Sequence, residues 1–397
     1  MKISIVDTTL SGDLIGGAQV FLPRLLSGLV QRGHHVKLLT RGSINERVRA
    51  AIVGSGASID TDVLGRPGLI EDVWRSSAGN VNAASPDVYA VSVAADLGWA
   101  VLPMLDPTIA TITIGHNDEE TFYAPVRHYR QFLTRAIGVS EEICDAYVKD
   151  CGIRRERVDW IPYGVGTRGR EPEETGGPLR LIYVGRFEEE QKRISDVVTL
   201  IKRLSAERVE YLFTLVGDGE SMRMVRERLA EEIARGSVRL PGWLPSDEVI
   251  REMNASDVFV LASAYEGFCI SLIEAMANGC TPVVTDIRSG NKQLVREGET
   301  GFVVPIGDIE GFVVRIKVLA GDRRRLMSMR NKAWEAGREY SIGRMVENYE
   351  TCFEQAVGDA RSAPRQTDPA FPLMPSCRSR YPLWLRRIKA KAMTLRG

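Results

Sequence analysis

The sequence has no excess of charge of either sign and no long apolar run. Lys plus Arg and Asp plus Glu each number 52 among 397 residues, so no net field would draw the chain to nucleic acid. No uninterrupted apolar stretch approaches the ~20 residues that cross a bilayer. The start, MKISIVDTTL, lacks the apolar region of a signal peptide. We therefore expect a cytoplasmic protein without a nucleic-acid partner.

Cysteine is also scarce, and its spacing carries no motif. Six cysteines are scattered along the chain, and no CxxC pair or zinc-finger spacing occurs among them. Reduced thiols in a cytosol fit this pattern best. Cys269 lies within the most informative segment of the chain, but nothing beside it marks a nucleophile. We interpret it as a small packing residue.

Strand and helix patterns alternate along the chain, which predicts parallel sheets with helices on both faces. The first strand is followed by a glycine-bearing loop and a helix over 18–31. The predicted strands of the first half are Lys2–Val6, His35–Thr40, Val88–Val93, Ala110–Ile114 and Ala136–Val139. Those of the second half are Leu179–Val184, Tyr211–Val216, Ser237–Leu240, Val258–Ala262, Thr281–Thr285 and Phe302–Val304.

The length and the two strand series predict two domains, each an α/β doubly wound sheet. Such halves face each other across a cleft, and a nucleotide would bind at the carboxyl ends of the second sheet's strands. The expected bounds are a first domain over 1–166, a polar linker over 167–177 and a second domain over 178–342. A helix over 343–360 would pack back towards the first domain, and a basic tail would follow over 361–397.

Two glutamates, Glu266 and Glu274, are separated by seven residues across an expected loop-to-helix transition. Ser271 is a plausible N-cap for a helix that runs through Asn278 and is closed by Gly279. The unpaired N–H groups of a helix start form an anion site. The spacing therefore puts one carboxylate on each side of a bound phosphate. The alternative is an ordinary amphipathic helix whose glutamates are solvated.

The wider context, SAYEGFCISLIEAMANGCTPVVT, resembles the E-x7-E motif of retaining, nucleotide-sugar-dependent glycosyltransferases of family 4, the group 1 glycosyl transferases. The resemblance covers about residues 1–358 and is strongest in the second half. It implies a GT-B fold of two Rossmann-like domains facing each other across a cleft. It also implies hexosyl transfer from a UDP- or GDP-sugar with retention of configuration. No metal or other cofactor is implied.

The same resemblance implies roles for individual residues. Glu266 matches the acid close to the transferred sugar, and His116, at a strand end, matches the active-site histidine. Arg186 and Lys192 follow the first strand of the second half, where the family clamps the donor diphosphate. The expected catalytic set is therefore Glu266, His116, Arg186 and Lys192. For the two cations the alternative is a solvated basic turn, and for His116 it is a satisfied structural histidine.

The donor-binding set follows from the same motifs. Glu274 matches the acceptor of ribose hydroxyls, the amides of residues 268–270 match those that hold the donor sugar, and Ser271 and Leu272 match those facing the distal phosphate. Besides Arg186, Lys192, Glu266 and Glu274, the expected donor-binding residues are Gly16, Gly17, Trp243, Leu244, Gly267, Phe268, Cys269, Ile270, Ser271 and Leu272.

Other readings of the sequence stay open. The Asp60-Thr61-Asp62 sequence is a DxD, but its turn-rich surroundings favour a surface loop with Asx turns, and we assign no metal there. A dinucleotide oxidoreductase would need GxGxxG directly after a strand, which SGDLIGGAQV does not supply. A noncatalytic or epimerase-type sugar-nucleotide-binding protein of the GT-B fold remains the rival function.

The tail after Asp368 contains seven Arg or Lys residues and no acid. If residues 382–395 are helical, apolar side chains fall on one face with basic ones around them. Such a segment suits an anionic membrane surface and would place the enzyme at the inner face of the membrane, near a lipid-linked acceptor or a cell-envelope or exopolysaccharide glycan. The alternative is a tail that is disordered or docked on the first domain.

Overall fold

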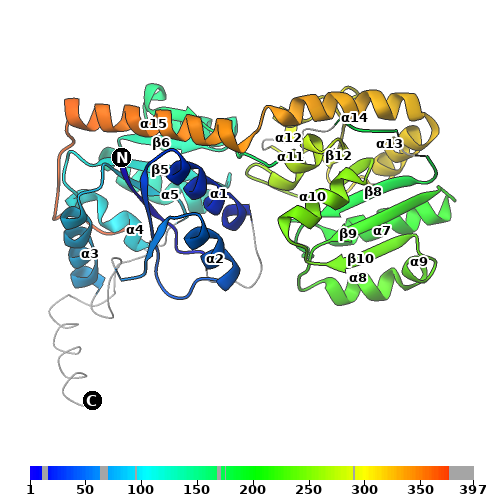
Figure 1. Ribbon diagram of the computed structural model, residues 1–397, viewed down its shortest axis with the longest axis horizontal. Coiled ribbons are helices and arrows are strands. Elements are labelled where there is room, and N and C mark those ends of the chain that lie inside the picture. The colour runs from blue at the N-terminus through cyan, green and yellow to red at the C-terminus, as the bar shows by residue number, and fades with distance from the viewer. Residues whose placement is uncertain are drawn as a thin grey trace, which may run out of the picture. The chain divides into compact units, whose positions relative to one another are not determined.

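The computed structural model describes residues 1–10, 17–62, 70–93, 96–167, 171–174, 176–288 and 291–374. The chain divides into two compact units. One comprises Met1–Ile161 together with the chain from Val346, and the other comprises Pro162–Met345. Each unit is built on its own sheet of parallel strands with helices between them (Figure 1).

The first unit has seven strands in the order β3-β2-β1-β4-β5-β6-β7, and every described pairing is parallel. The strands are β1 Lys2–Val6, β2 His35–Leu39, β3 Ser58–Asp60, β4 Val88–Val91, β5 Ala110–Gly115, β6 Arg135–Gly138 and β7 Val158–Trp160. The helices are α1 Gly17–Gln31, α2 Glu46–Gly54, α3 Ile70–Ala84, α4 Asp96–Ala100, α5 Glu120–Tyr129, α6 Glu141–Lys149 and α15 Ile342–Ser362, with 3₁₀ turns at Leu102–Met104, Arg130–Phe132 and Arg155–Arg157.

The second unit has six parallel strands in the order β10-β9-β8-β11-β12-β13. They are β8 Leu179–Val184, β9 Tyr211–Val216, β10 Val238–Gly242, β11 Val258–Leu261, β12 Thr281–Thr285 and β13 Phe302–Val304. The helices are α7 Ile194–Ala206, α8 Met222–Arg228, α9 Ala230–Ala234, α10 Ser246–Asn254, α11 Ile270–Ala277, α12 Asn291–Leu294, α13 Ile309–Gly321 and α14 Arg323–Arg338. The predicted two-domain, doubly wound α/β fold is thus confirmed.

In both sheets the strand order reverses beside the first strand of the unit, between β1 and β4 and between β8 and β11. The loops that leave two such strands turn to opposite faces of the sheet, and the crevice between them is where open α/β sheets bind ligands. The strands around it are buried on both faces: every residue of β4, β5, β11 and β12 is buried. The fold therefore offers one candidate site at the carboxyl edge of each sheet.

Helix α11 is fixed from behind by α14. A Cβ atom on Gly337 of α14 would lie 2.3 Å from the backbone nitrogen of Ala277, so only glycine permits this approach. Arg330 of α14 is also buried, and its Nη1 donates to Asp257 Oδ1 at 2.8 Å, just before β11. A buried ion pair is stabilising only when its remaining donors and acceptors are hydrogen-bonded. Arg330 Nε meets part of this requirement by donating to the carbonyl of Gly279 at 2.8 Å. These contacts tie α14 to both ends of the segment that carries Glu274.

The unit boundary falls earlier than the sequence suggested. Residues expected at the end of the first domain, 162–166, and the described residues of the expected linker, 167, 171–174, 176 and 177, belong with the second unit. Val165 pairs with Ser341, and the carbonyl of Glu173 accepts from Arg330 Nη1 at 2.9 Å. A Gly- and Pro-bearing polar segment indicated a connection, but these backbone contacts fasten it to one unit.

From Val346 on, helix α15 lies along the first unit beside α1 and the start of β6 (Figure 1). A Cβ on Gly28 of α1 would lie 2.3 Å from Val346 Cγ2, so the missing side chain makes room for α15. Glu350 accepts from Arg32 and His34, and Asp359 accepts from Arg135. The helix continues to Ser362, two residues beyond the expected end.

The chain after α15 stays on the first unit as far as it is described. The amide of Asp368 donates to the carbonyl of Pro103 at 2.8 Å, and the Phe371 ring meets the Phe132 ring at 4.8 Å. His128 Nε2 lies 2.8 Å from the carbonyl of Pro372. We call residues 363–374 the strap. The first part of the expected basic tail is therefore docked, whereas residues 375–397, with the expected helix over 382–395, lie outside the described residues.

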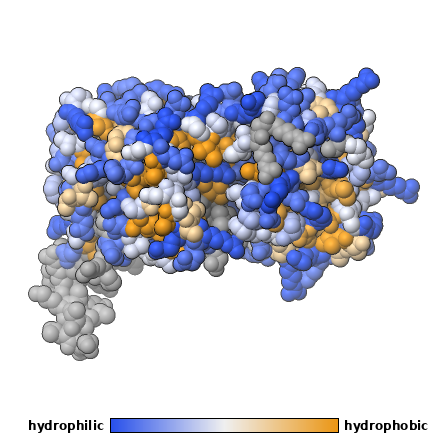
Figure 2. Space-filling view, viewed as in Figure 1, coloured by the Kyte–Doolittle hydropathy of each residue, from blue (hydrophilic) through white to orange (hydrophobic). Residues whose placement is uncertain are grey.

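Two further features concern the helices and the surface of the described residues. None of their helices is long and apolar enough to cross a membrane. On the face in Figure 2, hydrophilic residues make up most of the surface and hydrophobic ones occupy smaller areas between them.

Candidate active site

Three loops at the carboxyl edge of the second sheet are locked together by glycines. Gly217, after β9, has a φ of +143°, and a Cβ there would lie 1.9 Å from the carbonyl oxygen of Gly185, after β8. Its amide donates to the carbonyl of Gly242, at the end of β10, at 2.9 Å. Only glycine fits this crossing. The backbone conformation of Gly217 thus permits the turn, which sets the position of the loop that carries Arg186.

Glu266 and Lys192 form a buried ion pair at the β8–β11 switch point. Lys192 Nζ lies 2.5 Å from Glu266 Oε1, and their side chains are 12% and 7% exposed. Ser263 Oγ donates to the same carboxylate oxygen at 2.7 Å, and Gln191 Nε2 donates to the other at 3.2 Å. Burial opposes the charge on Lys192, but the neighbouring Glu266 carboxylate outweighs it and raises the pKa of the ammonium. Lys192 is therefore charged at neutral pH.

Arg186 joins this cluster through one amide. Its Nη2 donates to Gln191 Oε1 at 2.7 Å, while the Nε2 of the same amide donates to Glu266. Arg186 also lies 3.7 Å from Glu188 Oε1, and its side chain is 42% exposed. The three residues predicted from the second half, Arg186, Lys192 and Glu266, are thus brought together, with one cation buried and the other facing solvent.

The helix that carries Glu274 begins two residues earlier than predicted. Cys269, in extended conformation, precedes α11, so Ser271 lies inside the first turn and the prediction of Ser271 as N-cap is wrong. Gly279, with a φ of +81°, closes the helix as expected. Glu266 and Glu274 are both buried, which contradicts the alternative of an ordinary helix with solvated glutamates. The first amides of α11 lack helical partners, as in any helix, and begin four residues after Glu266.

The remaining predicted donor-binding residues fall into a buried and an exposed group. Gly267, Phe268, Cys269, Ile270 and Leu272 are buried, and the Phe268 ring lies between Tyr163 at 6.3 Å and Tyr340 at 5.8 Å. Burial raises the pKa of the Cys269 thiol to about 11, which agrees with a packing role. Trp243, after β10, is 38% exposed, and Leu244 is half-buried.

A second buried polar cluster lies at the carboxyl edge of the first sheet. His116, after β5, is buried, and its Nε2 lies 2.9 Å from Ser92 Oγ, after β4. Ser92 Oγ also donates to Asp7 Oδ2, after β1, at 3.2 Å, and Thr9 donates to the other oxygen of Asp7 through its amide and hydroxyl. Burial lowers the pKa of His116 to about 4 and raises that of Asp7. Ser92 therefore links a neutral imidazole to a buried acid.

The predicted glycine pair and the DxD are two further sequence motifs of the first half. Gly17 begins α1 and is exposed, whereas Gly16 lies outside the described residues. Asp60 Oδ1 accepts from the amide of Asp62 at 3.0 Å, the Asx turn expected of that DxD. Gln191, Ser263, Asp7 and Ser92 were not predicted from the sequence. Asp7 and Ser92 directly follow β1 and β4, and Ser263 comes two residues after the end of β11, so their place at strand ends was the available signal.

The fold is that of a two-unit α/β protein with a doubly wound parallel sheet in each unit and a polar cluster at the carboxyl edge of each sheet. The family model of glycosyl transferases group 1 matches residues 168–339, and that of glycosyltransferase family 4 matches residues 15–168. A lipopolysaccharide core biosynthesis glycosyltransferase of Rhizobium meliloti is 34% identical over 350 residues, which cover 83% of this chain and 91% of the relative. A putative colanic acid biosynthesis glycosyltransferase of Salmonella typhimurium is 31% identical over 231 residues, with 54% and 56% covered.

Solved structures agree on the fold. The Anabaena protein HepE in complex with UDP matches with a TM-score of 0.74 and 15% identity, over 89% of this chain and all of that one. The lipopolysaccharide outer core galactosyltransferase WaaB matches with a TM-score of 0.66 and 16% identity, over 89% and 99%. The chain belongs to the group 1, family 4 glycosyltransferases and has their GT-B fold, as the motif resemblance implied. It is a transferase.

The His116 cluster predicts a pH-dependent stability. The unfolded chain protonates this histidine near pH 6.5, whereas the folded chain holds it neutral down to about pH 4. Stability is therefore lost as pH falls through this window, and the histidine accounts for about 3 kcal/mol of the loss. Chemical denaturation at pH 7 and pH 4 should show a smaller loss in His116→Gln than in the wild type. Asp7 is present in both proteins, so their difference isolates the histidine.

His35→Gln removes an exposed histidine from the same unit and is the matched control. If wild type and His116→Gln lose the same stability between pH 7 and pH 4, the imidazole is not held neutral by its buried surroundings.

Proposed function

We propose that the protein is a retaining glycosyltransferase that moves a hexosyl group from a nucleoside diphosphate-sugar, a UDP- or GDP-sugar, to an acceptor in cell-envelope or exopolysaccharide glycan synthesis. The observation that carries the proposal is the buried Lys192–Glu266 pair beside Arg186 at the β8–β11 switch point. The relatives named for lipopolysaccharide core and colanic acid biosynthesis support the acceptor class. The solved relative that holds UDP supports the donor class.

The chemistry needs charge stabilisation where the donor breaks. The bond between the anomeric carbon and the phosphate oxygen breaks, and its electron pair passes to the diphosphate. The acceptor hydroxyl oxygen attacks the anomeric carbon from the same face, and its proton passes to the leaving diphosphate. Arg186, Lys192 and the first amides of α11 would stabilise the negative charge that grows on the leaving phosphate. These groups do the work of a metal ion, so we propose that none is required. The Glu266 carboxylate would lie close to the positive charge that develops on the sugar.

The other predicted residues take supporting roles in this proposal. Glu274 would accept hydrogen bonds from the ribose hydroxyls, a role that accounts for a buried acid on α11. The amides of residues 267–272 would hold the sugar and distal phosphate, and the loop with Trp243 and Leu244 would hold the base. Gly16 and Gly17 would approach the phosphates. His116, kept neutral and linked through Ser92 to Asp7, would serve the acceptor side of the reaction.

The rival function is a noncatalytic or epimerase-type sugar-nucleotide-binding protein. Such a protein has no need for both Arg186 and Lys192 as well as a buried histidine in the other unit. Incubation of the purified protein with nucleotide sugars, with and without acceptors, separates the classes. Transfer to an acceptor identifies the transferase, whereas binding without turnover, or a change in the sugar itself, identifies the rival.

The cations of the donor cluster give the sharpest kinetic prediction. Because charge on the leaving phosphate grows in the transition state, Arg186→Ala and Lys192→Ala should each lower kcat about 100-fold. Arg193→Ala, which removes the neighbouring cation paired with Asp196, is the matched control and should stay close to wild type. Steady-state transfer assays measure kcat. Thermal unfolding is measured in parallel, because Lys192→Ala leaves the buried Glu266 carboxylate without its cation. Near-native turnover in both folded variants would contradict the role.

The ribose role of Glu274 predicts a change in nucleotide affinity. Each hydrogen bond to a charged acceptor contributes about 1.5–3 kcal/mol, so Glu274→Ala should weaken binding of the nucleoside diphosphate at least tenfold. Glu335→Ala removes an exposed glutamate of α14 and should leave the affinity unchanged. Calorimetry with UDP and GDP measures both. Unchanged affinity in Glu274→Ala would remove this carboxylate from the donor site.

We also propose that residues 375–397 bring the enzyme to an anionic membrane, because the seven Arg and Lys residues after Asp368 have no acid among them. The strap is docked, so a chain ending after Met374 is a cleaner comparison than one cut inside α15. The full-length protein should sediment with vesicles containing anionic phospholipid at low salt, and the shortened chain should not. Equal sedimentation of the two would rule the segment out as a membrane contact.

A further inference from the structure

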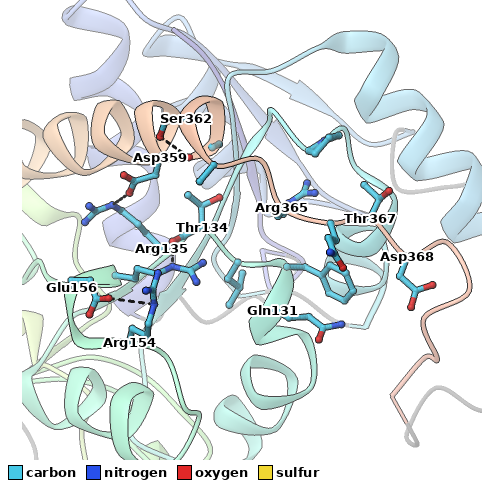
Figure 3. Close-up of a pocket in the computed structure, with 17 residues that line it drawn as sticks. Gln131, Thr134, Arg135, Arg154, Glu156, Asp359, Ser362, Arg365, Thr367 and Asp368 are labelled. Carbon is cyan, nitrogen blue, oxygen red and sulfur yellow. Dashed lines mark hydrogen bonds and ion pairs between the residues drawn. The ribbon is translucent and has the colours of Figure 1, made fainter.

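A polar pocket lies at the amino edge of the first sheet, the edge opposite to His116. It has a volume of about 670 Å³ and is lined by the start of β6, the turn before β7, the end of α15 and the strap (Figure 3). Four arginines line it, namely Arg135, Arg154, Arg157 and Arg365. The volume falls in the range of about 300–1,000 Å³ that small-molecule sites occupy.

Two of the four arginines are neutralised by acids at the pocket wall. Arg135 Nη1 pairs with Asp159 at 3.0 Å and its Nε pairs with Asp359 at 2.9 Å, while Arg154 pairs with Glu156 at 3.3 Å. Figure 3 shows Asp359 reaching Arg135 from α15 and Glu156 beside Arg154. These carboxylates are therefore committed to Arg135 and Arg154.

Arg157 and Arg365 lack such partners. Arg157 Nε donates to the carbonyl of Thr134 at 2.7 Å. Arg365 donates to the carbonyls of Leu105 and Asp106 at 3.2 and 3.1 Å, and its Nε donates to Thr111 Oγ1 at 3.4 Å. Neither takes part in an ion pair with a carboxylate of the described residues, and both are half-buried. Each guanidinium group has five N–H donors, so these bonds leave some N–H donors of each group available to a ligand.

Burial disfavours the charged forms of these two arginines. Burial lowers the pKa of Arg365 to about 10, and burial, followed by the positive charge of Arg154, lowers that of Arg157. An anion bound in the pocket beside either guanidinium would offset this penalty. Guanidinium forks match the oxygens of a phosphate group in a bidentate way, which a lysine could not do.

We infer that this pocket is a second binding site, for a phosphate-bearing small molecule whose phosphate contacts Arg157 and Arg365. Gln131 and Thr367, which line the same space, supply polar groups for the rest of the ligand. Arg365 belongs to the strap, so a ligand bound to it also fastens the strap to the first unit. The site is independent of the donor cluster, which is built from residues of the second unit.

The test titrates full-length protein with inorganic pyrophosphate by calorimetry, in the Lys192→Ala background to suppress binding at the donor cluster. Arg157→Gln should weaken the remaining binding about tenfold or more, since charge-assisted bonds to phosphate are lost. Arg155→Gln is the matched control, because it removes an exposed cation of the same 3₁₀ turn that does not line the pocket. Arg365→Gln should weaken binding similarly, and hydrogen exchange over the strap reports whether that variant stays docked.

A second arm separates a soluble phosphate from a lipid headgroup. Arg157→Gln and Arg155→Gln are compared for sedimentation with phosphatidylcholine vesicles that contain phosphatidic acid. Both carry the same C-terminal segment, so only the pocket distinguishes them. Weaker pyrophosphate binding in Arg157→Gln alone identifies a soluble ligand, and weaker sedimentation in Arg157→Gln alone identifies a headgroup. Equal behaviour of the two variants in both arms, with intact folds, overturns the proposal.

Discussion

The buried pair of Lys192 and Glu266 is the interaction around which the second unit's site is arranged. Taking both charges out of water costs several kcal/mol for each ion, and attraction repays it only when other hydrogen bonds satisfy the pair. Ser263 and Gln191 supply those bonds to the carboxylate. The pair joins the loop after β8 to the loop after β11, the two strands between which the chain order reverses. Arg186 is held in place through the same glutamine.

Close backbone approaches keep this pair where it is. The Gly217 turn presses against Gly185 and fixes the loop with Arg186, while Gly337 lets α14 lie against α11. Neither approach tolerates a side chain. The first unit uses the same topological position differently, because its switch-point loops place Asp7 and Ser92 next to His116, a hydrogen-bonded chain with no cation in it. One edge is thus suited to stabilise a developing anion, and the other to hold a neutral imidazole.

Much of the fold could be predicted from the sequence, for identifiable reasons. Short, mostly apolar runs predicted β8, β9, β12 and β13 to the residue. The three-residue strands β3 and β7 were missed because Ser58–Asp60 and Val158–Trp160 each contain polar residues and are too short for a periodic signal. The start of α11 was misplaced by two residues because Ser271 is a good N-cap residue by type, whereas the residue that precedes the helix in extended conformation is Cys269.

The site was predictable as a set of motifs but not as a set of contacts. Glu266, Arg186 and Lys192 carried family motifs, whereas Gln191 and Ser263 matter only because β8 and β11 are neighbours in the sheet. Asp7, Ser92 and His116 come together for the same reason, from three strands that are separated by many residues along the chain. The pocket of Arg157 and Arg365 depends on a strap whose path no local pattern indicates.

In the proposed function, the second unit binds the diphosphate and sugar of the donor around Glu266. This binding can be tested by hydrogen–deuterium exchange of the full-length protein with each member of a panel of nucleotide sugars. We expect at least one nucleotide sugar to slow exchange in the segments 185–193 and 266–274 together. Slowed exchange confined to the first unit, or an unchanged pattern with every UDP- and GDP-sugar, would contradict it.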